Sequence, residues 1–265
     1  MINLFCCIGV DEYITNLNLL YHFFDFYKKH GVDEFYIILQ SNRGDNKRIS
    51  DAQNILREFN ITEKFTWMDD YYSPRLHQFM RRAIADMDKT GWMIPADIDE
   101  FHNFPLRAKL FLRDCDNRGI NCVRGQLLDK VAQDGELNPI KKEIPIDRQF
   151  PFCADITKEL AKGNTGKITA FKKPLIPGKG NHAVTKKKWR TVYHGQIIDC
   201  HHFKWDSLAP GRVEKRFRCY SEKKINWYKE SERVYRYLQK RKKIMPEHFP
   251  LRQAGPLFYP KREDV

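Results

Sequence analysis

Short apolar runs alternate with helix-type patterns through the first hundred residues, and this alternation limits the possible folds more than any other feature. The apolar runs have the length of strands and occupy residues 2–8, 33–39, 64–68 and 92–96. Each of the first three runs is followed by a stretch with apolar residues at helical spacing. This alternation is typical of βαβ units and predicts an α/β fold, with helices flanking a mixed, mostly parallel central sheet.

The predicted helices are marked by their apolar faces and their ends. The first begins near Leu17 and stops before Gly31, a residue that suits a helix end. The second covers residues 49–59. The third has Ser73 as its N-cap and Pro74 at its first helical position. Its apolar stripe consists of Leu76, Phe79, Met80, Ala83, Ile84 and Met87.

The second half of the chain is less regular. Residues 120–137 have the pattern of a strand, a turn at Asp134 and Gly135, and a returning strand. Residues 162–184 are rich in Gly, Pro and Lys, which predicts turns and loops over a site. Residues 193–205 contain a further strand.

Length and composition indicate a folded chain with one large domain and an appendage. The chain has 265 residues, of which 42% are hydrophobic, so it can bury a substantial core. Beyond residue 210 the sequence becomes strongly basic and takes on helical spacing. We therefore expect a domain of residues 1–210 and a basic helical C-terminal extension of residues 211–265.

The formal net charge of +13 favours partners that carry phosphates, although a generic basic surface would have the same charge. The seven cysteines include the adjacent pair Cys6 and Cys7 but no CxxC pair. This usage argues against a disulfide framework and a structural zinc site, and it fits a reducing compartment. The apolar start is too short for a signal or a membrane span. We therefore expect a cytoplasmic protein.

Three carboxylates end the fourth apolar run, in the stretch "GWMIPADIDEF". Asp97, Asp99 and Glu100 would stand at the carboxyl edge of the sheet, where open α/β sheets bind ligands. Two aspartates at that place can share a Mg²⁺ or Mn²⁺ ion that also binds phosphate oxygens. The alternative is that they cap a turn or a helix. The later stretch "DCHHFKW" could add an imidazole ligand.

These pieces, taken in order, resemble a known family. "GWMIPADIDEF", the later "GNH" and the returning "HHFKW" look like the motifs of family 2-like glycosyltransferases, whose acidic motif is DxDEF. "GQLLDKVAQDGEL" resembles the family's stretch in which an acidic and a basic residue precede a glycine turn. The resemblance covers roughly residues 2–206. It implies a GT-A fold, a nucleotide-sugar donor, a divalent metal ion and transfer with inversion.

The resemblance also implies roles for single residues. Asp97 and Asp99 would hold the cation and the donor, and Glu100 would shape the acceptor side or orient a ligand. His202 would be the returning contact to the metal or to a phosphate. Asp129, before a basic residue, is the candidate general base. The histidine that follows the glycine loop, also a candidate catalytic residue, is His182.

Several basic residues are candidate contacts for the donor phosphates or for the acceptor, and each could equally be a solvated surface charge. They are Arg75, Arg81, Lys167, Lys179 and Lys204. The paired His201 and His202 would point to opposite faces of a strand, and we expect His202 to face the site.

The basic tail leaves three interpretations open. It could lie on an anionic membrane at the inner membrane face, bind an anionic glycan acceptor, or pack back on the main domain. The partners expected are a nucleotide-sugar donor and a glycan or lipid-linked glycan acceptor. A nucleic-acid-binding protein and a metal-dependent nuclease or phosphotransferase are the alternative functions. The sequence shows no zinc-finger spacing, no aromatic RNP-like strand and no helix-turn-helix signature, and a carboxylate trio suits a metal, so nucleic acid is not expected.

Overall fold

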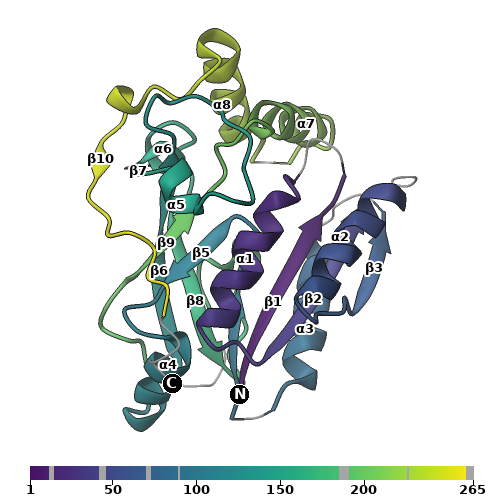
Figure 1. Cartoon of the computed structure of the whole chain (residues 1–265), viewed down its shortest axis with the longest axis vertical. Helices are drawn as coiled ribbons and strands as arrows, with labels where there is room; N and C mark the ends of the chain where they lie inside the picture. Colours follow the sequence, from purple (N-terminus) through teal and green to yellow (C-terminus); the bar gives the residue numbers. More distant parts are fainter. Residues whose placement is uncertain are drawn as a thin grey trace.

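The computed structural model describes residues 1–11, 15–41, 46–69, 73–88, 90–184, 191–225 and 227–260. The amino-terminal half forms four parallel strands, β1 (Ile2–Gly9), β2 (Glu34–Ser41), β3 (Phe65–Met68) and β4 (Trp92–Pro95). Their order across the sheet is β4-β1-β2-β3, and all four end at the same edge (Figure 1). The four predicted strands are therefore confirmed.

The other strands complete a mixed sheet with the order β10-β7-β6-β8-β4-β1-β2-β3. Strand β9 runs parallel to β6 and antiparallel to β5, so this pair extends the other side of β6. These strands are β5 (Glu100–Asn103), β6 (Cys122–Val131), β7 (Phe152–Ala154), β8 (Gly166–Lys172), β9 (Ile198–His202) and β10 (Leu251–Arg252).

Two sequence-based expectations for the second half were wrong. Strand β8 occupies the centre of the region expected to be loops, because its backbone pairs with both β6 and β4. The turn at Gly135 is present, but no strand returns from it, since residues 132–145 contain no strand. The antiparallel partners of β6 are β7 and β8, which come later in the chain.

Helices cover both faces of the sheet and confirm the predicted fold class. Helices α1 (Asn18–Lys29), α2 (Asn46–Glu58) and α4 (Ala108–Asn117) contribute to one hydrophobic cluster. Helix α3 (Ser73–Asp86) contributes to a second cluster. The short helices are α5 (Ile146–Gln149), α6 (Ile156–Glu159), η1 (Lys179–Asn181) and η2 (Pro246–His248).

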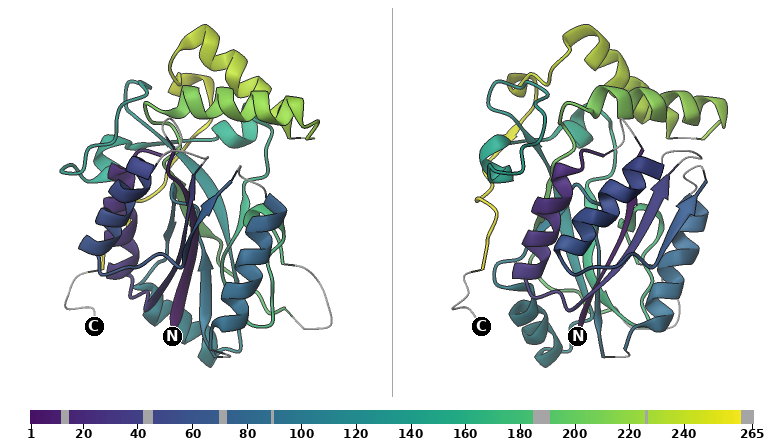
Figure 2. Two further views of the ribbon diagram at one scale, coloured as in Figure 1. Left: turned by 90° about the vertical axis from the view of Figure 1, so that its right-hand side faces the viewer. Right: turned by 45° about the vertical axis from the view of Figure 1, so that its right-hand side comes forward.

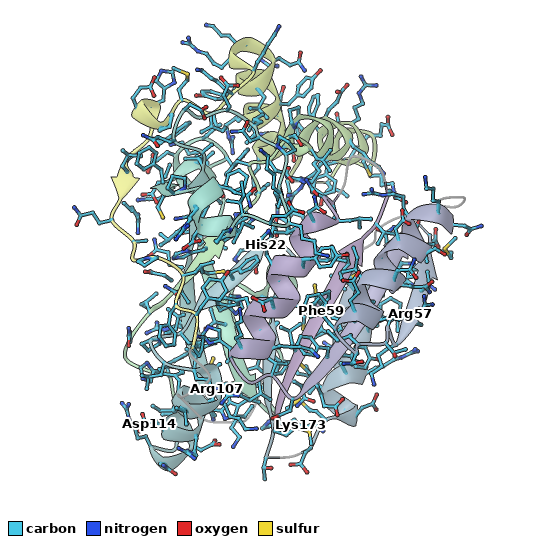
Figure 3. All side chains as sticks on the ribbon, in the orientation of Figure 1. His22, Arg57, Phe59, Arg107, Asp114 and Lys173 are labelled. Carbon is cyan, nitrogen blue, oxygen red and sulfur yellow. The ribbon has the colours of Figure 1, made fainter. Side chains whose placement is uncertain are left out.

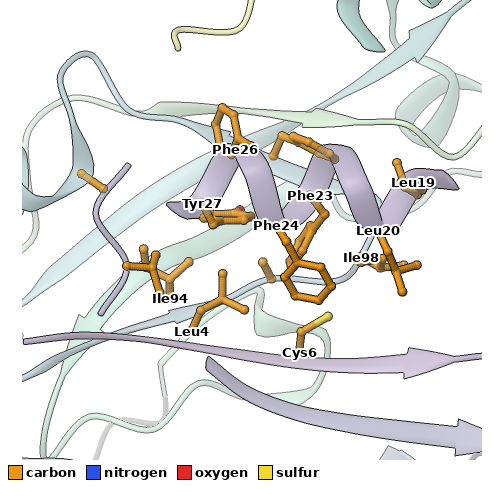
Figure 4. Packing of buried hydrophobic residues seen from close by; sticks show 14 of the residues in the cluster. Leu4, Cys6, Leu19, Leu20, Phe23, Phe24, Phe26, Tyr27, Ile94 and Ile98 are labelled. Carbon is orange, nitrogen blue, oxygen red and sulfur yellow. The ribbon is translucent and has the colours of Figure 1, made fainter. Parts of the chain in front are cut away.

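Strand β1 contributes to both clusters because successive side chains of a strand point to opposite faces. Leu4, Cys6 and Ile8 join the first cluster, whereas Phe5 joins the second. Aromatic side chains of α1 pack over Leu4 and Cys6 (Figure 4). Burial on both faces explains why the parallel strands are continuously apolar.

The basic extension begins as a pair of helices, α7 (Ala209–Glu222) and α8 (Tyr228–Arg241). They pack on a third hydrophobic cluster, which also includes Val131 of β6 and Trp205. The expected domain boundary at residue 210 lies inside α7. The pair covers the end of the molecule toward which the parallel strands point (Figure 2).

After α8 the chain forms only the short helix η2 and is then extended from residue 249 to residue 260. Strand β10 pairs with β7, and the following segment runs along the side of the molecule toward the end that lies opposite α7 and α8 (Figure 1). The side chain of Asn103 donates to the Pro256 carbonyl over 3.2 Å, and its oxygen accepts from the Phe258 N–H over 2.7 Å. Thus the helical expectation holds for α7 and α8 but is wrong for residues 249–260.

We predict that Gly135→Ala destabilises the protein far more than Gly119→Ala. Both glycines have positive φ, which costs alanine about 1–2 kcal/mol. A Cβ at Gly135 would lie 1.7 Å from the Ile244 carbonyl oxygen, whereas one at Gly119 meets nothing within 4 Å. The clash adds roughly 1–3 kcal/mol. Urea unfolding measures both variants, and equal losses would contradict this account of how the residues after α8 dock.

Candidate functional site

The predicted carboxylates lie where β4 leaves the sheet. The Ala96 N–H donates to the Phe5 carbonyl, so the chain stays tied to β1 up to that point. A turn follows in which the Glu100 N–H donates to the Asp97 carbonyl over 2.9 Å. Strand β5 then begins at Glu100 itself. The three acids therefore surround one turn at the carboxyl edge.

Asp99, His202 and Asp129 form a row across the strands. In register, His202 of β9 lies opposite Glu100 of β5 and Asp129 of β6. The His202 Nε2 lies 3.4 Å from Asp99 Oδ2, and its Nδ1 lies 2.9 Å from Asp129 Oδ1. The Phe203 N–H donates to the Asp99 carbonyl and fixes this aspartate beside the imidazole.

The row is electrostatically coupled. Burial opposes protonation of His202, but Asp99 and Asp129 outweigh it and raise the pKa of His202 to about 9. Burial likewise opposes ionisation of Asp99, but the imidazolium lowers the pKa of this carboxyl well below its usual range. At neutral pH His202 is therefore an imidazolium, with its Nδ1–H toward Asp129 and its Nε2–H toward Asp99.

Asp129 is 1% exposed and accepts four hydrogen bonds. Two come from the backbone N–H and hydroxyl of Thr157, and one each from His202 and the Trp205 indole. These donors leave the carboxylate little capacity to take a proton from a substrate. Its position suits a residue that orients His202, as carboxylates behind metal-bound histidines do.

His201 and His202 point to opposite faces, as the alternation of a strand requires. The His201 ring lies 6.5 Å from that of Phe203 and is completely buried. Burial, with Lys130 nearby, lowers the pKa of His201 to about 3. His202 is the histidine that faces the carboxylates.

Lys167 lies between two of the three acids, Asp97 and Glu100. Its Nζ lies 2.6 Å from Glu100 Oε1 and 3.7 Å from Asp97 Oδ2. Burial opposes ionisation of Glu100, but Lys167 outweighs it and lowers the pKa of Glu100 to about 2. The Glu100 side chain is 3% exposed, whereas that of Asp97 is 55% exposed. Of this pair, Asp97 is the group that solvent reaches.

A second group of possible metal ligands lies behind the first. Atoms of Glu100, His102 and Cys200 fall within 4.8 Å of one another, and all three residues are buried. Glu100 is already paired with the Lys167 ammonium. Burial raises the pKa of Cys200, so this thiol resists the deprotonation that metal binding requires. A thiol also suits Mn²⁺ and Mg²⁺ less well than oxygen does.

His182 lies close to the ion pair. It follows η1, where the Gly180 carbonyl accepts from Lys167 Nζ over 3.1 Å. Gly180 has a positive φ, and a Cβ there would lie 2.8 Å from the His182 ring. His182 Nδ1 lies 2.6 Å from the Gly166 carbonyl. This nitrogen therefore carries the proton of a neutral ring, which leaves Nε2 as an acceptor.

Basic residues approach the row from the start of α7. Arg212 Nη2 lies 2.6 Å from Asp206 Oδ1, and it also donates to the Lys204 carbonyl. The charges of Arg212 and Lys204 act with His202 in lowering the pKa of Asp99. Further along the helix, Lys215 Nζ lies 3.7 Å from Asp11 Oδ2 at the end of β1.

Other predicted phosphate contacts are not brought to the row. Arg75 forms an ion pair of 3.3 Å with Asp69 after β3, and its guanidinium lies over Trp67. It lines a cavity of about 320 Å³ between β3 and α3. Arg81 is exposed on the same helix. The side chain of Lys179 lies outside the described part of the structure.

Sequence reasoning missed the contacts made by Thr157 and Arg212. Thr157 lies in the four-residue helix α6, which is too short to show a helical pattern in the sequence. Arg212 was one of many basic residues in the tail, and only the packing of α7 distinguishes it. Trp205 was part of the quoted "HHFKW", but its bond to Asp129 depends on the tertiary fold.

No protein-family profile matches the chain, and no curated protein matches it. Among solved structures it is similar to HddC from Yersinia pseudotuberculosis, at 14% identity and a TM-score of 0.31, over 50% of this chain and 60% of that one. It is also similar to 4-diphosphocytidyl-2C-methyl-D-erythritol synthase, at 15% identity and a TM-score of 0.31, over 64% and 74%. S. aureus TarS has 12% identity and a TM-score of 0.34, over 83% and 39%. Scores this low carry no argument about function.

Among the described residues, no helix has both the length and the apolarity needed to cross a bilayer.

We predict that Asp129→Asn lowers the pKa of His202. A carboxylate favours the imidazolium and an amide does not, so the pKa should fall from about 9 by roughly 1–3 units. NMR titration of labelled histidine measures this change. Asp155→Asn is the control, because this buried aspartate pairs with Arg252. If the pKa of His202 were unchanged in the Asp129 variant, Asp129 would not be a group that stabilises the imidazolium.

Proposed function

We propose that the chain is a metal-dependent glycosyltransferase of the GT-A type. It would move a sugar from a nucleotide-sugar donor to a hydroxyl of a glycan or glycolipid acceptor. The observation that carries the proposal is the 3.4 Å approach of Asp99 Oδ2 to His202 Nε2 at the carboxyl edge of the sheet. The resemblance of the DxDEF and HHFKW stretches supports the same conclusion.

The Asp99 and His202 pair can hold a divalent ion once the ion displaces the Nε2 proton of the imidazolium. One carboxylate oxygen and one imidazole nitrogen lie on the same side of the turn, and Asp129 holds the imidazole from behind. Mn²⁺ accepts this mixed donor set more readily than Mg²⁺, which prefers oxygen. When bound, the ion supplies positive charge that stabilises the departing nucleoside diphosphate. Asp97, the more exposed acid, can contact the ion or the donor.

The donor phosphates would lie between this pair and α7. Lys204 and Arg212 act electrostatically on Asp99, so their charges can also act on an anion bound next to it. Lys167 is committed to Glu100, which makes it a support for the acidic turn rather than a phosphate ligand. Arg75 and Arg81 have no assigned role in donor binding.

The reaction is a direct displacement at the anomeric carbon of the donor sugar. A bond forms between the acceptor oxygen and that carbon, while the bond to the diphosphate oxygen breaks and its electron pair leaves with the diphosphate. The acceptor proton passes to a base. We assign this role to His182, because Nε2 can accept a proton and burial lowers the pKa of the ring, which keeps it neutral. Asp129 instead positions His202.

We predict that Asp99→Asn abolishes donor binding that depends on Mn²⁺. The wild-type protein should gain about 2.7 kcal/mol of stability at a ligand concentration 100 times the Kd. Thermal shifts with UDP-, GDP- and CMP-sugars, each with and without Mn²⁺, measure this effect. Asp114→Asn, an exposed aspartate on α4, is the control and should behave as wild type.

The donor panel also separates the competing functions. A nuclease or phosphotransferase would respond to Mn²⁺ without preferring any sugar nucleotide, and a nucleic-acid-binding protein would respond to an oligonucleotide without Mn²⁺. Either pattern would replace the present proposal. If the Asp99 variant responded to donor and Mn²⁺ as strongly as wild type, Asp99 would not be a metal ligand.

We predict that His182→Gln lowers kcat by about 10²–10⁴, the usual contribution of a general base. Its Kd for the donor should change little, because the ring acts on the acceptor. Single-turnover kinetics and calorimetry measure the two quantities separately. His248→Gln is the control, because His248 is exposed beyond α8. If kcat were unchanged in the His182 variant, a group other than His182 would be the general base.

A further inference from the structure

The positive charge of the chain is concentrated in the helix pair. Residues 209–243 contain 13 Lys and Arg but only four Asp and Glu, so this segment carries +9 of the net +13. Two of the four acids are paired within their own helices, Glu214 with Arg218 and Glu232 with Arg236. Three of its basic residues pair with acids elsewhere in the chain, Arg212 with Asp206, Lys215 with Asp11 and Lys243 with Glu136. The segment remains strongly basic after these three pairs are counted.

The apolar faces of both helices are already covered. Val213 of α7, with Val234 and Leu238 of α8, is buried in the third hydrophobic cluster. A helix that lies flat on a membrane must offer an apolar face to the lipid, so the membrane contact left open for the tail would have to use residues other than the buried apolar faces of α7 and α8. Their remaining side chains project outward at this end of the molecule (Figure 3).

The turn between the helices has a different composition. Lys223 and Lys224 are exposed there, Lys229 is exposed in the first turn of α8, and the Trp227 side chain is 41% exposed. The Tyr220 ring lies 6.5 Å from that of Trp227. We call these five residues the hairpin tip. An indole flanked by lysines is the combination that settles at the interface between lipid and water.

The hairpin tip is carried on a rigid support. Phe217 of α7 stacks on Tyr235 of α8, with ring centroids 5.3 Å apart. The Arg233 guanidinium donates twice to the Ala161 carbonyl, over 2.6 and 3.1 Å. The helix pair therefore holds the tip away from the sheet, on the same side as the carboxyl edge (Figure 2).

We infer that the hairpin tip binds the surface of an anionic lipid bilayer, with the Trp227 indole at the level of the headgroups and the lysines against lipid phosphates. Complementary charge supplies the attraction, and the exposed indole favours a bilayer over a soluble polyanion. This binding does not depend on the proposed transfer reaction. If that proposal also holds, the tip brings the carboxyl edge close to lipid-linked acceptors.

Co-flotation of the full chain with vesicles tests the inference. The vesicles are phosphatidylcholine alone or phosphatidylcholine with phosphatidylglycerol. The double variant Lys223→Glu/Lys224→Glu should bind the anionic vesicles at least about tenfold more weakly, since each basic residue near the surface contributes about 1 kcal/mol. The matched control Arg113→Glu/Arg118→Glu makes the same charge change on an exposed residue of α4 and on its exposed C-cap residue, at the other end, and should bind as wild type.

Trp227→Ala separates a bilayer from other anions. It should weaken binding to anionic vesicles severalfold and leave binding to heparin unchanged. The inference is overturned if both double variants lose vesicle binding equally, or if wild type prefers heparin and Trp227→Ala affects neither ligand. The melting temperature of each variant, measured by circular dichroism, shows whether a loss of vesicle binding reflects unfolding.

Discussion

The alternation of charge through Asp99, His202 and Asp129 is the interaction on which the candidate site depends. Each of these groups would be costly to bury alone, and each is stabilised by its neighbour of opposite charge. Strands β5, β9 and β6 bring them together, so the row fixes the register of three strands as well as the position of an imidazole. Thr157 and Trp205 complete the row by saturating Asp129.

The acidic turn has a second, separate support. Lys167 neutralises Glu100 from strand β8, and the η1 carbonyl that binds Lys167 lies next to His182. The two supports divide the carboxylates by role. Glu100 and Asp129 are buried and saturated, whereas Asp97 and Asp99 remain accessible to a ligand. The fold divides the acids in this way because it buries Glu100 and Asp129 and leaves Asp97 and Asp99 in reach of solvent.

The amino-terminal half could be predicted from sequence because its strands are buried on both faces and its helices carry continuous apolar stripes. The acids at the end of β4 could be placed for the same reason, since a strand end fixes the sheet edge. Strand β8 could not, because Gly, Pro and Lys surround it and its buried Lys167 breaks the apolar pattern. The surroundings of Asp129 and Arg212 depend on contacts between distant segments, which local periodicity does not encode.

The row joins segments roughly 100 residues apart, and this separation affects how the protein is made. At a synthesis rate of about 5–20 residues per second, Asp99 leaves the ribosome roughly 5–20 s before His202. Strands β1 to β4 can pair during that interval, while β6 and Asp129 still wait for β9. The nascent chain can therefore form the β1 to β4 part of its sheet before the row of Asp99, His202 and Asp129 is complete.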